Sequence, residues 1–453
     1  MNVIKLFVER RASTIFLSRT ASNKRKFIDL KEEEDLPIFQ YPVSKSTDRR
    51  VYVWGLAETG ALGVHMARRM KKFKKSYRNN FSFIWHPIRS SFCERFDVTN
   101  IACGYGFTVA SVKTKEQHKV FGTGINTDSQ IGYHAPRLGR PLEMLLSPAP
   151  IYIPYKSLET KITALSAGRA HTVILTDNEG VYTLGNNAYG QCGRKINPNE
   201  EYRGSMASHN IKSLGKEKII DICCGQDHSL FITESGKVYA CGWGADGQTG
   251  LGIYENQGYP AAVKGDITSE KIVKIASTAD CVLALNDSGE LFGWGNSEYG
   301  QVPMNSNQQQ VNMSYALVNF TKGLGKIVDI AAGGSYCLIC NENGDVFVWG
   351  FGLLGLGPQV QHAKTPKQIP PPLFGRNEFN PESMVTKVAC GIGHLAAVTN
   401  DGDLYMWGRN RHGCLGLGHG KDQHFPLKIS IGAQVLSVKC SVDHTVAVCK
   451  PFT

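Results

Sequence analysis

Residues 165–193 read LSAGRAHTVILTDNEGVYTLGNNAYGQCG, and this arrangement recurs along the chain. A strand of small residues leads into G-x-x-H, and an alternating apolar segment then runs to a polar turn that ends in glycine. A second alternating segment also ends in a glycine, with another glycine five residues later. Two alternating segments around a glycine turn are typical of a β-hairpin. The stretch therefore predicts short antiparallel strands.

The second half of this pattern occurs seven times. Its leading glycines are spaced 69, 61, 57, 53, 55 and 58 residues apart, and they are Gly55, Gly124, Gly185, Gly242, Gly295, Gly350 and Gly408. The glycine five residues further on is kept in six copies and is replaced by Ser129 in the other. A period of roughly 55 residues supplies about four strands, which is one blade of a β-propeller. We predict an all-β fold, a single seven-bladed propeller over residues 50–450.

The two ends of the chain complement each other. The strand at 51–55 ends in Trp-Gly but has no G-x-x-H strand before it, whereas the strands at 438–449 have the G-x-x-H half alone. Closing a propeller ring removes free sheet edges. We therefore expect the N-terminal strand to complete the last blade.

One position of the G-x-x-H half is occupied by Phe107, His171, His228, Cys281, Tyr336, His394 and His444 in the seven copies. Because Phe, Cys and Tyr replace His, this position requires a bulky buried side chain and not a metal ligand. Equivalent positions in neighbouring blades are also too far apart for ligands at about 2.0–2.3 Å from one metal. We expect His171, His228, His394 and His444 to be structural, and we expect no metal site.

The N-terminal segment 1–26 contains seven Lys or Arg residues and one acid, so it contributes +6 to the formal net charge of +11. It is rich in Ser and lacks the apolar run of about 7–15 residues that a secretory signal needs, which is typical of a mitochondrial transit peptide. Residues 27–49 are predicted to be an acidic linker. We expect the protein in the mitochondrial matrix or on the matrix side of the inner membrane. No apolar run approaches the roughly 18 residues that span a bilayer, so we expect no transmembrane segment.

The first interval of the repeat contains a dense cationic segment, with seven Lys and Arg residues in eleven positions beside aromatic side chains. The candidates for polyanion contact are Arg68, Arg69, Lys71, Lys72, Lys74, Lys75, Tyr77, Arg78 and Trp85. Such a density is typical of phosphate contact. The aromatic side chains could stack on unpaired bases or insert at an anionic membrane surface. Three interpretations stay open: contact with RNA or a ribosome, contact with anionic lipid, and a solvated loop.

The paired motifs G-x-x-H-[ST] and [VL]-[FY]-x-W-G-x-N-x-x-G-Q-[LC]-G resemble the regulator of chromosome condensation repeat family over about residues 50–450. The presequence, the basic first interval and the seven repeats together resemble its mitochondrial, guanine-exchange-factor-like branch. Propellers of this family can exchange nucleotide on a GTPase by inserting a loop beside the phosphate site. The polar stretch 194–215 departs from the repeat, but no exchange residue can be carried over to it.

The resemblance implies guanine-nucleotide exchange on a mitochondrial GTPase, with the dynamin-like GTPase of inner-membrane fusion as the best candidate. The alternative comes from the basic segment: an RNA- or ribosome-binding assembly factor for the mitochondrial large ribosomal subunit, with ribosomal RNA or ribosomal proteins as partners. Peripheral contact with the anionic inner membrane is a further expectation. Two stretches, 242–247 and 350–355, fit G-x-G-x-x-G, but another strand follows each where a dinucleotide site needs a helix. We expect no catalytic residue, no cofactor and no enzyme activity involving covalent chemistry.

Overall fold

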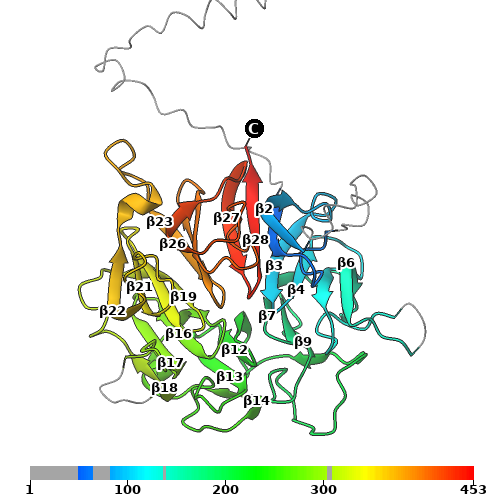
Figure 1. Ribbon diagram of the computed structural model, residues 1–453. Coiled ribbons are helices and arrows are strands. Elements are labelled where there is room, and N and C mark those ends of the chain that lie inside the picture. The colour runs from blue at the N-terminus through cyan, green and yellow to red at the C-terminus, as the bar shows by residue number, and fades with distance from the viewer. Residues whose placement is uncertain (1–48, 65–81, 136–138, 304–308, 453) are drawn as a thin grey trace, which may run out of the picture. The chain divides into compact units, whose positions relative to one another are not determined.

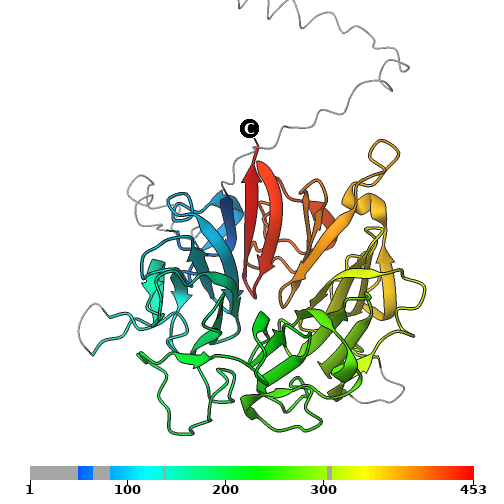
Figure 2. The same cartoon turned by 180° about the vertical axis from the view of Figure 1, so that it is seen from behind.

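The computed structural model describes residues 49–64, 82–135, 139–303 and 309–452. In these ranges, 28 strands form seven antiparallel sheets of four strands each. Figures 1 and 2 show the sheets following one another around a ring. The predicted all-β, seven-bladed propeller is confirmed.

Each sheet is one blade, and the blades are numbered from the first complete sheet in the chain. Blade 1 consists of β3 (Val98–Gly104), β4 (Phe107–Val112), β5 (Val120–Ile125) and β6 (Met144–Ile151). Blade 2 consists of β7 (Ile162–Ala167), β8 (His171–Thr176), β9 (Val181–Gly185) and β10 (His209–Ile211). Blade 3 consists of β11 (Ile219–Cys224), β12 (His228–Thr233), β13 (Val238–Gly242) and β14 (Gln257–Ala262).

Blade 4 consists of β15 (Ile272–Ala276), β16 (Cys281–Asn286), β17 (Leu291–Asn296) and β18 (Gln310–Ala316). Blade 5 consists of β19 (Ile327–Ala332), β20 (Tyr336–Asn341), β21 (Val346–Phe351) and β22 (His362–Ile369). Blade 6 consists of β23 (Val385–Cys390), β24 (His394–Thr399), β25 (Leu404–Gly408) and β26 (Gln423–Lys428). Blade 7 is β27 (Ala433–Cys440), β28 (His444–Pro451), β1 (Arg50–Leu56) and β2 (Phe83–Arg89). Two short 3₁₀ helices, Asp266–Ser269 and Pro371–Phe374, lie on the connections after blades 3 and 5.

The N-terminal strand closes the ring. Strand β1 pairs antiparallel with β28, and Val51 lies opposite Val448 while Trp54 lies opposite Thr445. The first strands of the seven blades surround one central cavity, and their contacts run from blade to blade and return from β27 to β3. The predicted closure is confirmed. The closing blade also contains β1 and β2, the two strands that flank the basic segment in the sequence.

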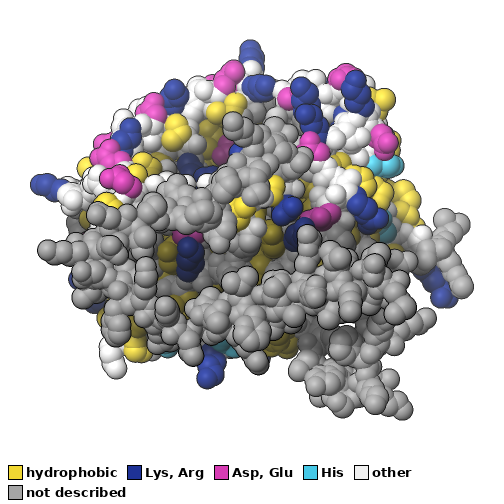
Figure 3. Space-filling view, turned by 90° about the horizontal axis from the view of Figure 1, so that it is seen from above, with side chains coloured by type: hydrophobic (Ala, Val, Ile, Leu, Met, Phe, Trp, Pro, Cys, Tyr) yellow, Lys and Arg dark blue, Asp and Glu magenta, His cyan; other side chains and the backbone are white. Residues whose placement is uncertain are grey.

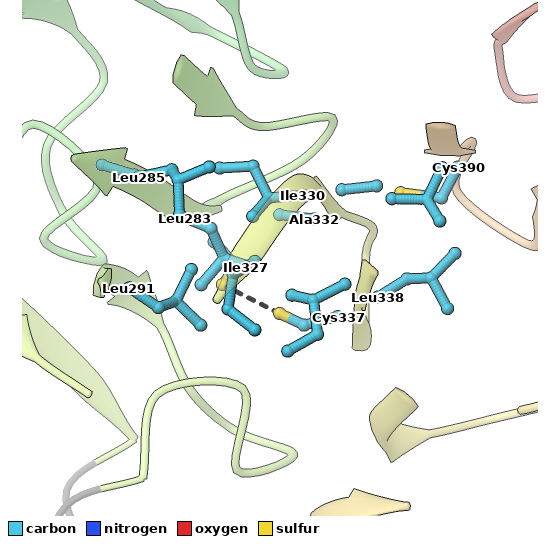
Figure 4. Packing of buried hydrophobic residues seen from close by; sticks show 14 of the residues in the cluster. Leu283, Leu285, Leu291, Ile327, Ile330, Ala332, Cys337, Leu338 and Cys390 are labelled. Atoms are coloured by element: carbon cyan, nitrogen blue, oxygen red, sulfur yellow. Dashed lines mark hydrogen bonds between the residues drawn. The ribbon is translucent and has the colours of Figure 1, made fainter. Parts of the chain in front are cut away.

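The second strand of a blade is buried on both of its faces. Strands β8, β12, β16, β20 and β24 are buried along their whole length. Figure 4 shows Leu283 and Leu285 of β16 beside Ile327 and Ile330 of β19, in the next blade. Alternate side chains of these strands therefore point to the two neighbouring blades, and neither face of the strand is turned to solvent.

The seven leading glycines of the repeat share one strained backbone position. Their φ angles lie between +95° and +112°. A Cβ at any of them would lie 2.2–2.6 Å from the carbonyl oxygen of the residue before the G-x-x-H histidine position; at Gly295 it would lie 2.2 Å from the oxygen of Asp280. Only glycine fits a left-handed backbone that packs this closely. Ser129, which replaces the second glycine in blade 1, keeps a left-handed φ of +57°.

The loop after the third strand is shorter in blade 5 than the sequence spacing suggested. A Cβ at Gly355 would lie 2.7 Å from Trp407 Nε1, just as one at Gly416 would lie 3.0 Å from Trp54 Nε1. Gly355 therefore occupies the place of a third glycine, not of the second. Counted from the leading glycine, the loop is three residues shorter, because Gly355 follows Gly350 by five residues whereas Gly416 follows Gly408 by eight.

Candidate functional site

The histidine position of the repeat links neighbouring blades through side-chain hydrogen bonds. His394 Nε2 lies 3.0 Å from Thr445 Oγ1, and the Thr445 hydroxyl donates to the Cys414 carbonyl at 2.8 Å. Because the threonine proton is used there, Nε2 must carry the histidine proton and donate. The Trp54 indole N–H donates to the same carbonyl at 2.7 Å. One loop carbonyl of blade 6 thus ties two strands of blade 7.

The same relay joins blades 2 and 3. His171 Nε2 lies 3.0 Å from Ser229 Oγ, whose hydroxyl donates to the Gln191 carbonyl at 2.7 Å. The Nδ1 atoms of His171, His228 and His394 are buried and have no hydrogen-bond partner among the described residues. Burial lowers the pKa of His171 and of His228 to about 3, and that of His394 to about 4. These three rings are neutral structural side chains. In the described part of the chain, no three His, Cys, Asp or Glu side chains are grouped so as to hold a metal ion.

His444 has a different environment from the other three. Its Nδ1 lies 2.9 Å from Asp443 Oδ1, and its Nε2 lies 2.9 Å from Thr108 Oγ1 in blade 1. Burial acts to lower the pKa of His444, but the hydrogen bonds with Asp443 and Cys103 outweigh it and raise that pKa to about 10. The ring is therefore protonated, and the Asp443–His444 ion pair lies in the contact between blades 7 and 1.

Blades 4 and 5 replace this polar relay with thiols. Cys281 stands at the histidine position and Cys337 at the Ser/Thr position of the next blade, with their Sγ atoms 3.9 Å apart (Figure 4). Tyr336 stands at the histidine position of blade 5, and its hydroxyl donates to the carbonyl oxygens of Gly391 and His394 at 3.0 and 3.2 Å. All thirteen cysteines are free.

The loops of the propeller emerge on two opposite faces. Because successive strands run antiparallel, the G-x-x-H turns and the loops after the third strands emerge together, on what we call the G-x-x-H face. The turns between second and third strands emerge on the other side, which we call the hairpin face. The polar stretch 194–215 and the described residues 57–64 both follow the third strand of a blade, so both begin on the G-x-x-H face.

Four carboxylates of blades 1, 3 and 4 gather on the G-x-x-H face, and we call them the acidic patch: Asp128, Asp227, Asp246 and Asp280. Arg169 is their cationic partner, and its Nη2 and Nε lie 2.7 and 3.1 Å from the carboxylate of Asp227. Among the described residues, the other three carboxylates form no ion pair and accept hydrogen bonds from neutral groups: Asn186 to Asp128 at 2.7 Å, Gln310 to Asp246 at 2.8 Å and Gln248 to Asp280 at 2.9 Å.

Asp280 is the most perturbed carboxyl group of the acidic patch. Burial raises its pKa to about 6, the negative charges of Asp246 and Asp227 add to the rise, and the hydrogen bond from Gln248 opposes it. Burial and like charges bring the pKa of this carboxyl group close to neutral pH, so a nearby cation would stabilise its charged form. The acidic patch is therefore suited to bind a cationic group of a partner. The sequence pattern did not single it out, because its members come from three different repeats.

The predicted polyanion-contact segment is only partly within the structure. Arg68, Arg69, Lys71, Lys72, Lys74, Lys75, Tyr77 and Arg78 lie outside the described residues. Trp85 lies in β2 and is partly buried. Its six-membered ring covers the loop of blade 6, since a Cβ at Gly413 or Gly420 would lie 2.7 or 3.0 Å from it, and the Phe83 ring centroid lies 5.2 Å away. Packing between blades 7 and 6 thus accounts for this tryptophan.

Further cations lie next to Trp85, on the described loop of blade 6. Arg409, Arg411 and Lys421 are exposed there, beside the partly buried His412. Figure 3 shows the molecule from above, and on its described surface Lys and Arg side chains are interspersed with Asp and Glu, with hydrophobic groups between them. No helix among the described residues is long and apolar enough to cross a membrane.

Sequence comparison identifies the repeat. The regulator of chromosome condensation (RCC1) repeat profile matches residues 48–111, 178–232, 235–285, 343–398 and 401–448. The chain is 43% identical over 427 residues to the RCC1-like G exchanging factor-like protein of Mus musculus, covering 93% of this chain and 92% of the relative. It is 42% identical over 435 residues to the protein of that name from Homo sapiens, covering 92% and 90%.

Solved structures agree with this identification. The crystal structure of human WBSCR16 matches with a TM-score of 0.82 at 42% identity, covering 89% of this chain and 100% of that one. Prp20p of Saccharomyces cerevisiae, described with its binding to Gsp1p and histones, matches with a TM-score of 0.71 at 20% identity, covering 94% and 96%; this likeness concerns the fold alone. From its repeats, its ring closure and these relatives, the chain belongs to the regulator of chromosome condensation (RCC1) repeat family.

Proposed function

We propose that the chain is a guanine-nucleotide exchange factor for a mitochondrial GTPase, with the dynamin-like GTPase of inner-membrane fusion as the best candidate. The observation that carries this proposal is the 42–43% identity to proteins called RCC1-like G exchanging factor-like, over at least 90% of both chains. Exchange requires no covalent chemistry. The factor binds the nucleotide-free GTPase more tightly than the loaded form, and so shifts the equilibrium towards release.

The acidic patch is the surface that we assign to this contact. In a loaded P-loop GTPase, a lysine, backbone N–H groups and Mg²⁺ hold the phosphates. When the nucleotide leaves, the lysine loses its anionic partner, and a carboxylate offered by the propeller can replace it. Asp280 suits this role because, among the described residues, its carboxylate accepts a hydrogen bond only from the neutral Gln248. Its pKa of about 6 leaves it ready to ionise fully beside a cation.

Release of a fluorescent GDP analogue from the purified GTPase tests the proposal. At micromolar full-length propeller with excess unlabelled nucleotide, we expect faster release. Asp280→Asn keeps the shape of the side chain and is expected to reduce this acceleration about tenfold or more, since hydrogen bonds to charged groups contribute about 1.5–3 kcal/mol and each 1.4 kcal/mol is tenfold. Asp401→Asn is the matched control, because Asp401 is exposed in a turn on the hairpin face.

Two results would contradict this assignment at different levels. Failure of the unmodified propeller to accelerate release would reject exchange on that GTPase. Acceleration that is unchanged in Asp280→Asn but lost in a variant of another face would keep the exchange activity and reject the acidic patch as its contact.

RNA or ribosome contact is the second candidate function, and a specific observation favours it. The described loop of blade 6 that packs against Trp85 exposes three cations, Arg409, Arg411 and Lys421. Basic surfaces bind nucleic acid by releasing counterions, so their affinity falls steeply with added salt. We propose this surface as the contact of an assembly factor for the mitochondrial large ribosomal subunit.

A pull-down from mitochondrial lysate tests this second function. The unmodified protein is compared with a variant whose basic segment is charge-reversed at Arg68, Arg69, Lys71, Lys72, Lys74 and Lys75. We expect large-subunit ribosomal RNA to be recovered with the first protein only, and binding to weaken as salt is raised. Equal recovery by both proteins, or an affinity that does not change with salt, would reject the basic segment as a phosphate contact.

We also propose that residues 1–26 direct import into mitochondria, based on their charge and composition. A fluorescent reporter fused to residues 1–49 should enter mitochondria, and the same fusion with the cations of residues 1–26 replaced by glutamine should stay outside. A reporter that remains cytosolic in both cases would reject the transit peptide.

A further inference from the structure

A cavity of about 580 Å³ lies on the axis of the ring, between the first strands of the seven blades. Small-molecule sites commonly occupy about 300–1,000 Å³. At the G-x-x-H face two hydrogen bonds cross the axis: the Tyr105 hydroxyl of blade 1 donates to the Thr278 carbonyl of blade 4 at 3.0 Å, and the Thr278 hydroxyl donates to the Cys390 carbonyl of blade 6 at 3.3 Å. They narrow the cavity at that end, so a ligand would enter from the hairpin face.

Five charged side chains line this cavity, and two of them neutralise each other. Lys274 of blade 4 forms an ion pair with Asp329 of blade 5. Asp329 also accepts the Val388 backbone N–H of blade 6 at 2.8 Å. This pair ties three successive blades, and it contributes no net charge to the cavity.

The other two lysines of the cavity keep uncompensated charges. Lys387 of blade 6 donates to the Leu436 carbonyl of blade 7 at 2.6 Å, which is a neutral acceptor. Lys439 of blade 7 is exposed, and its amino group forms no hydrogen bond or ion pair with another described residue. Lys439 also departs from the repeat pattern. The equivalent position in blades 1 to 6 is occupied by small residues: Ala102, Ser166, Cys223, Ala276, Ala331 and Ala389.

Asp221 of blade 3 is the remaining charge. Its carboxylate accepts a hydrogen bond from the backbone N–H of the next residue, Ile222, at 2.9 Å. It has no ion-pair partner among the described residues. Burial raises the pKa of Asp221, and the charges of Lys439 and Lys274 act against that rise. Burial, and then the charge of Lys439, lowers the pKa of Lys274 to about 8. The amino groups of these lysines therefore repel one another, and an anion between them would relieve that repulsion.

We propose that the axial cavity binds a small organic dicarboxylate that also carries a hydrogen-bond donor, such as a hydroxy- or amino-dicarboxylate. Its two anionic groups contact Lys387 and Lys439, and its donor contacts Asp221. Two uncompensated cations and one carboxylate around a single cavity are complementary to this combination of groups. Charge-assisted hydrogen bonds of this kind are among the strong ones in proteins. The inference is independent of the exchange activity, which we assign to another surface.

Isothermal titration calorimetry of the full-length protein at low salt tests the proposal, with L-malate, L-aspartate, succinate and inorganic phosphate as probes. We expect malate or aspartate to bind more tightly than succinate, which has the two carboxylates without the donor. Lys439→Ala installs the residue type of the neighbouring blades and is expected to weaken binding at least about tenfold. Asp221→Asn is expected to reduce the preference for malate or aspartate over succinate.

Lys322→Ala and Asp401→Asn serve as matched controls, because both residues are exposed and lie outside the cavity; these variants should bind as the unmodified protein does. No saturable binding of any probe up to millimolar concentration would overturn the proposal, and so would equal affinity in Lys439→Ala. Binding of phosphate alone would overturn the dicarboxylate class. An acidic peptide that binds where the small dianions do not would assign the cavity to a partner's tail and overturn the proposal as well.

Discussion

Replacing His394 with glutamine is expected to make the stability of the propeller less sensitive to acid. The His394 ring is fully buried, its Nε2–H donates to Thr445, and its Nδ1 has no partner. A proton added at Nδ1 would place a charge in a site without an acceptor. Burial therefore lowers the pKa of His394 to about 4. Glutamine can keep the donor to Thr445 and cannot titrate.

The sign and the size of the effect follow from linkage. In the unfolded chain a histidine has a pKa of about 6.5. Below that pH the unfolded state binds a proton that the folded state does not bind, so the free energy of unfolding decreases as the pH is lowered. Between the unfolded pKa of about 6.5 and the folded pKa of about 4 lie about 2.5 pH units, at about 1.4 kcal/mol each. This histidine should thus account for about 3.5 kcal/mol of acid destabilisation. Asp280, whose raised pKa of about 6 acts in the opposite direction, is the same in both proteins and cancels in the comparison.

Urea denaturation at several values between pH 7.5 and pH 4 measures this difference. At pH 7.5 the variant should be less stable by about 1–2 kcal/mol, because the amide fits the hydrogen bond less well than the ring. As the pH falls, the two free energies of unfolding should converge and then cross. His118→Gln is the control, because His118 is exposed, and its curve should run close to that of the unmodified protein. Parallel curves for His394→Gln and the unmodified protein would refute the reasoning that burial keeps this ring neutral.

Two further substitutions test the packing of the repeat by chemical denaturation. Gly295→Ala should destabilise the protein by at least about 2 kcal/mol more than Gly300→Ala, because both positions have positive φ but only at Gly295 would the Cβ collide with backbone; similar costs would show that strain alone matters. Trp349→Phe should lower the free energy of unfolding by about 1 kcal/mol more than Trp407→Phe does. The Trp349 indole donates to the Gln301 carbonyl at 2.8 Å, whereas Trp407 Nε1, which faces the shorter loop of blade 5, has no partner among the described residues. The reverse order would contradict the shorter loop of blade 5.

The fold could be predicted almost completely from the sequence, because it depends on local geometry that repeats. Gly55 and its six equivalents mark the end of every third strand, and each needs a left-handed backbone. The unmatched strands at the two chain ends sufficed to predict the pairing of β1 with β28. The shorter loop of blade 5 was missed because Gly355 keeps the expected spacing while occupying the place of a different glycine.

The histidine position shows where sequence reasoning stops. Substitution by Phe, Cys and Tyr predicts a buried structural residue, but it does not indicate that Thr445 in the next blade accepts the His394 proton. Nor does it separate His444, held by Asp443, from three rings without a partner at Nδ1. Asp227 also precedes a histidine, yet it pairs with Arg169. The direction in which such a carboxylate turns depends on the neighbouring blade.

The sequence by itself determined the repeat, the number of blades, the ring closure and the family, because each blade is specified by residues that are close together in the chain. Only the tertiary structure decided which side chains meet across blades. The acidic patch joins Asp128, Asp227, Asp246 and Asp280 from three blades. The axial cavity places Lys439 near Asp221, which lies 218 residues away in the sequence. A ring brings equivalent positions of distant repeats to one axis and one face, so side chains with no relation in sequence share a single electrostatic environment.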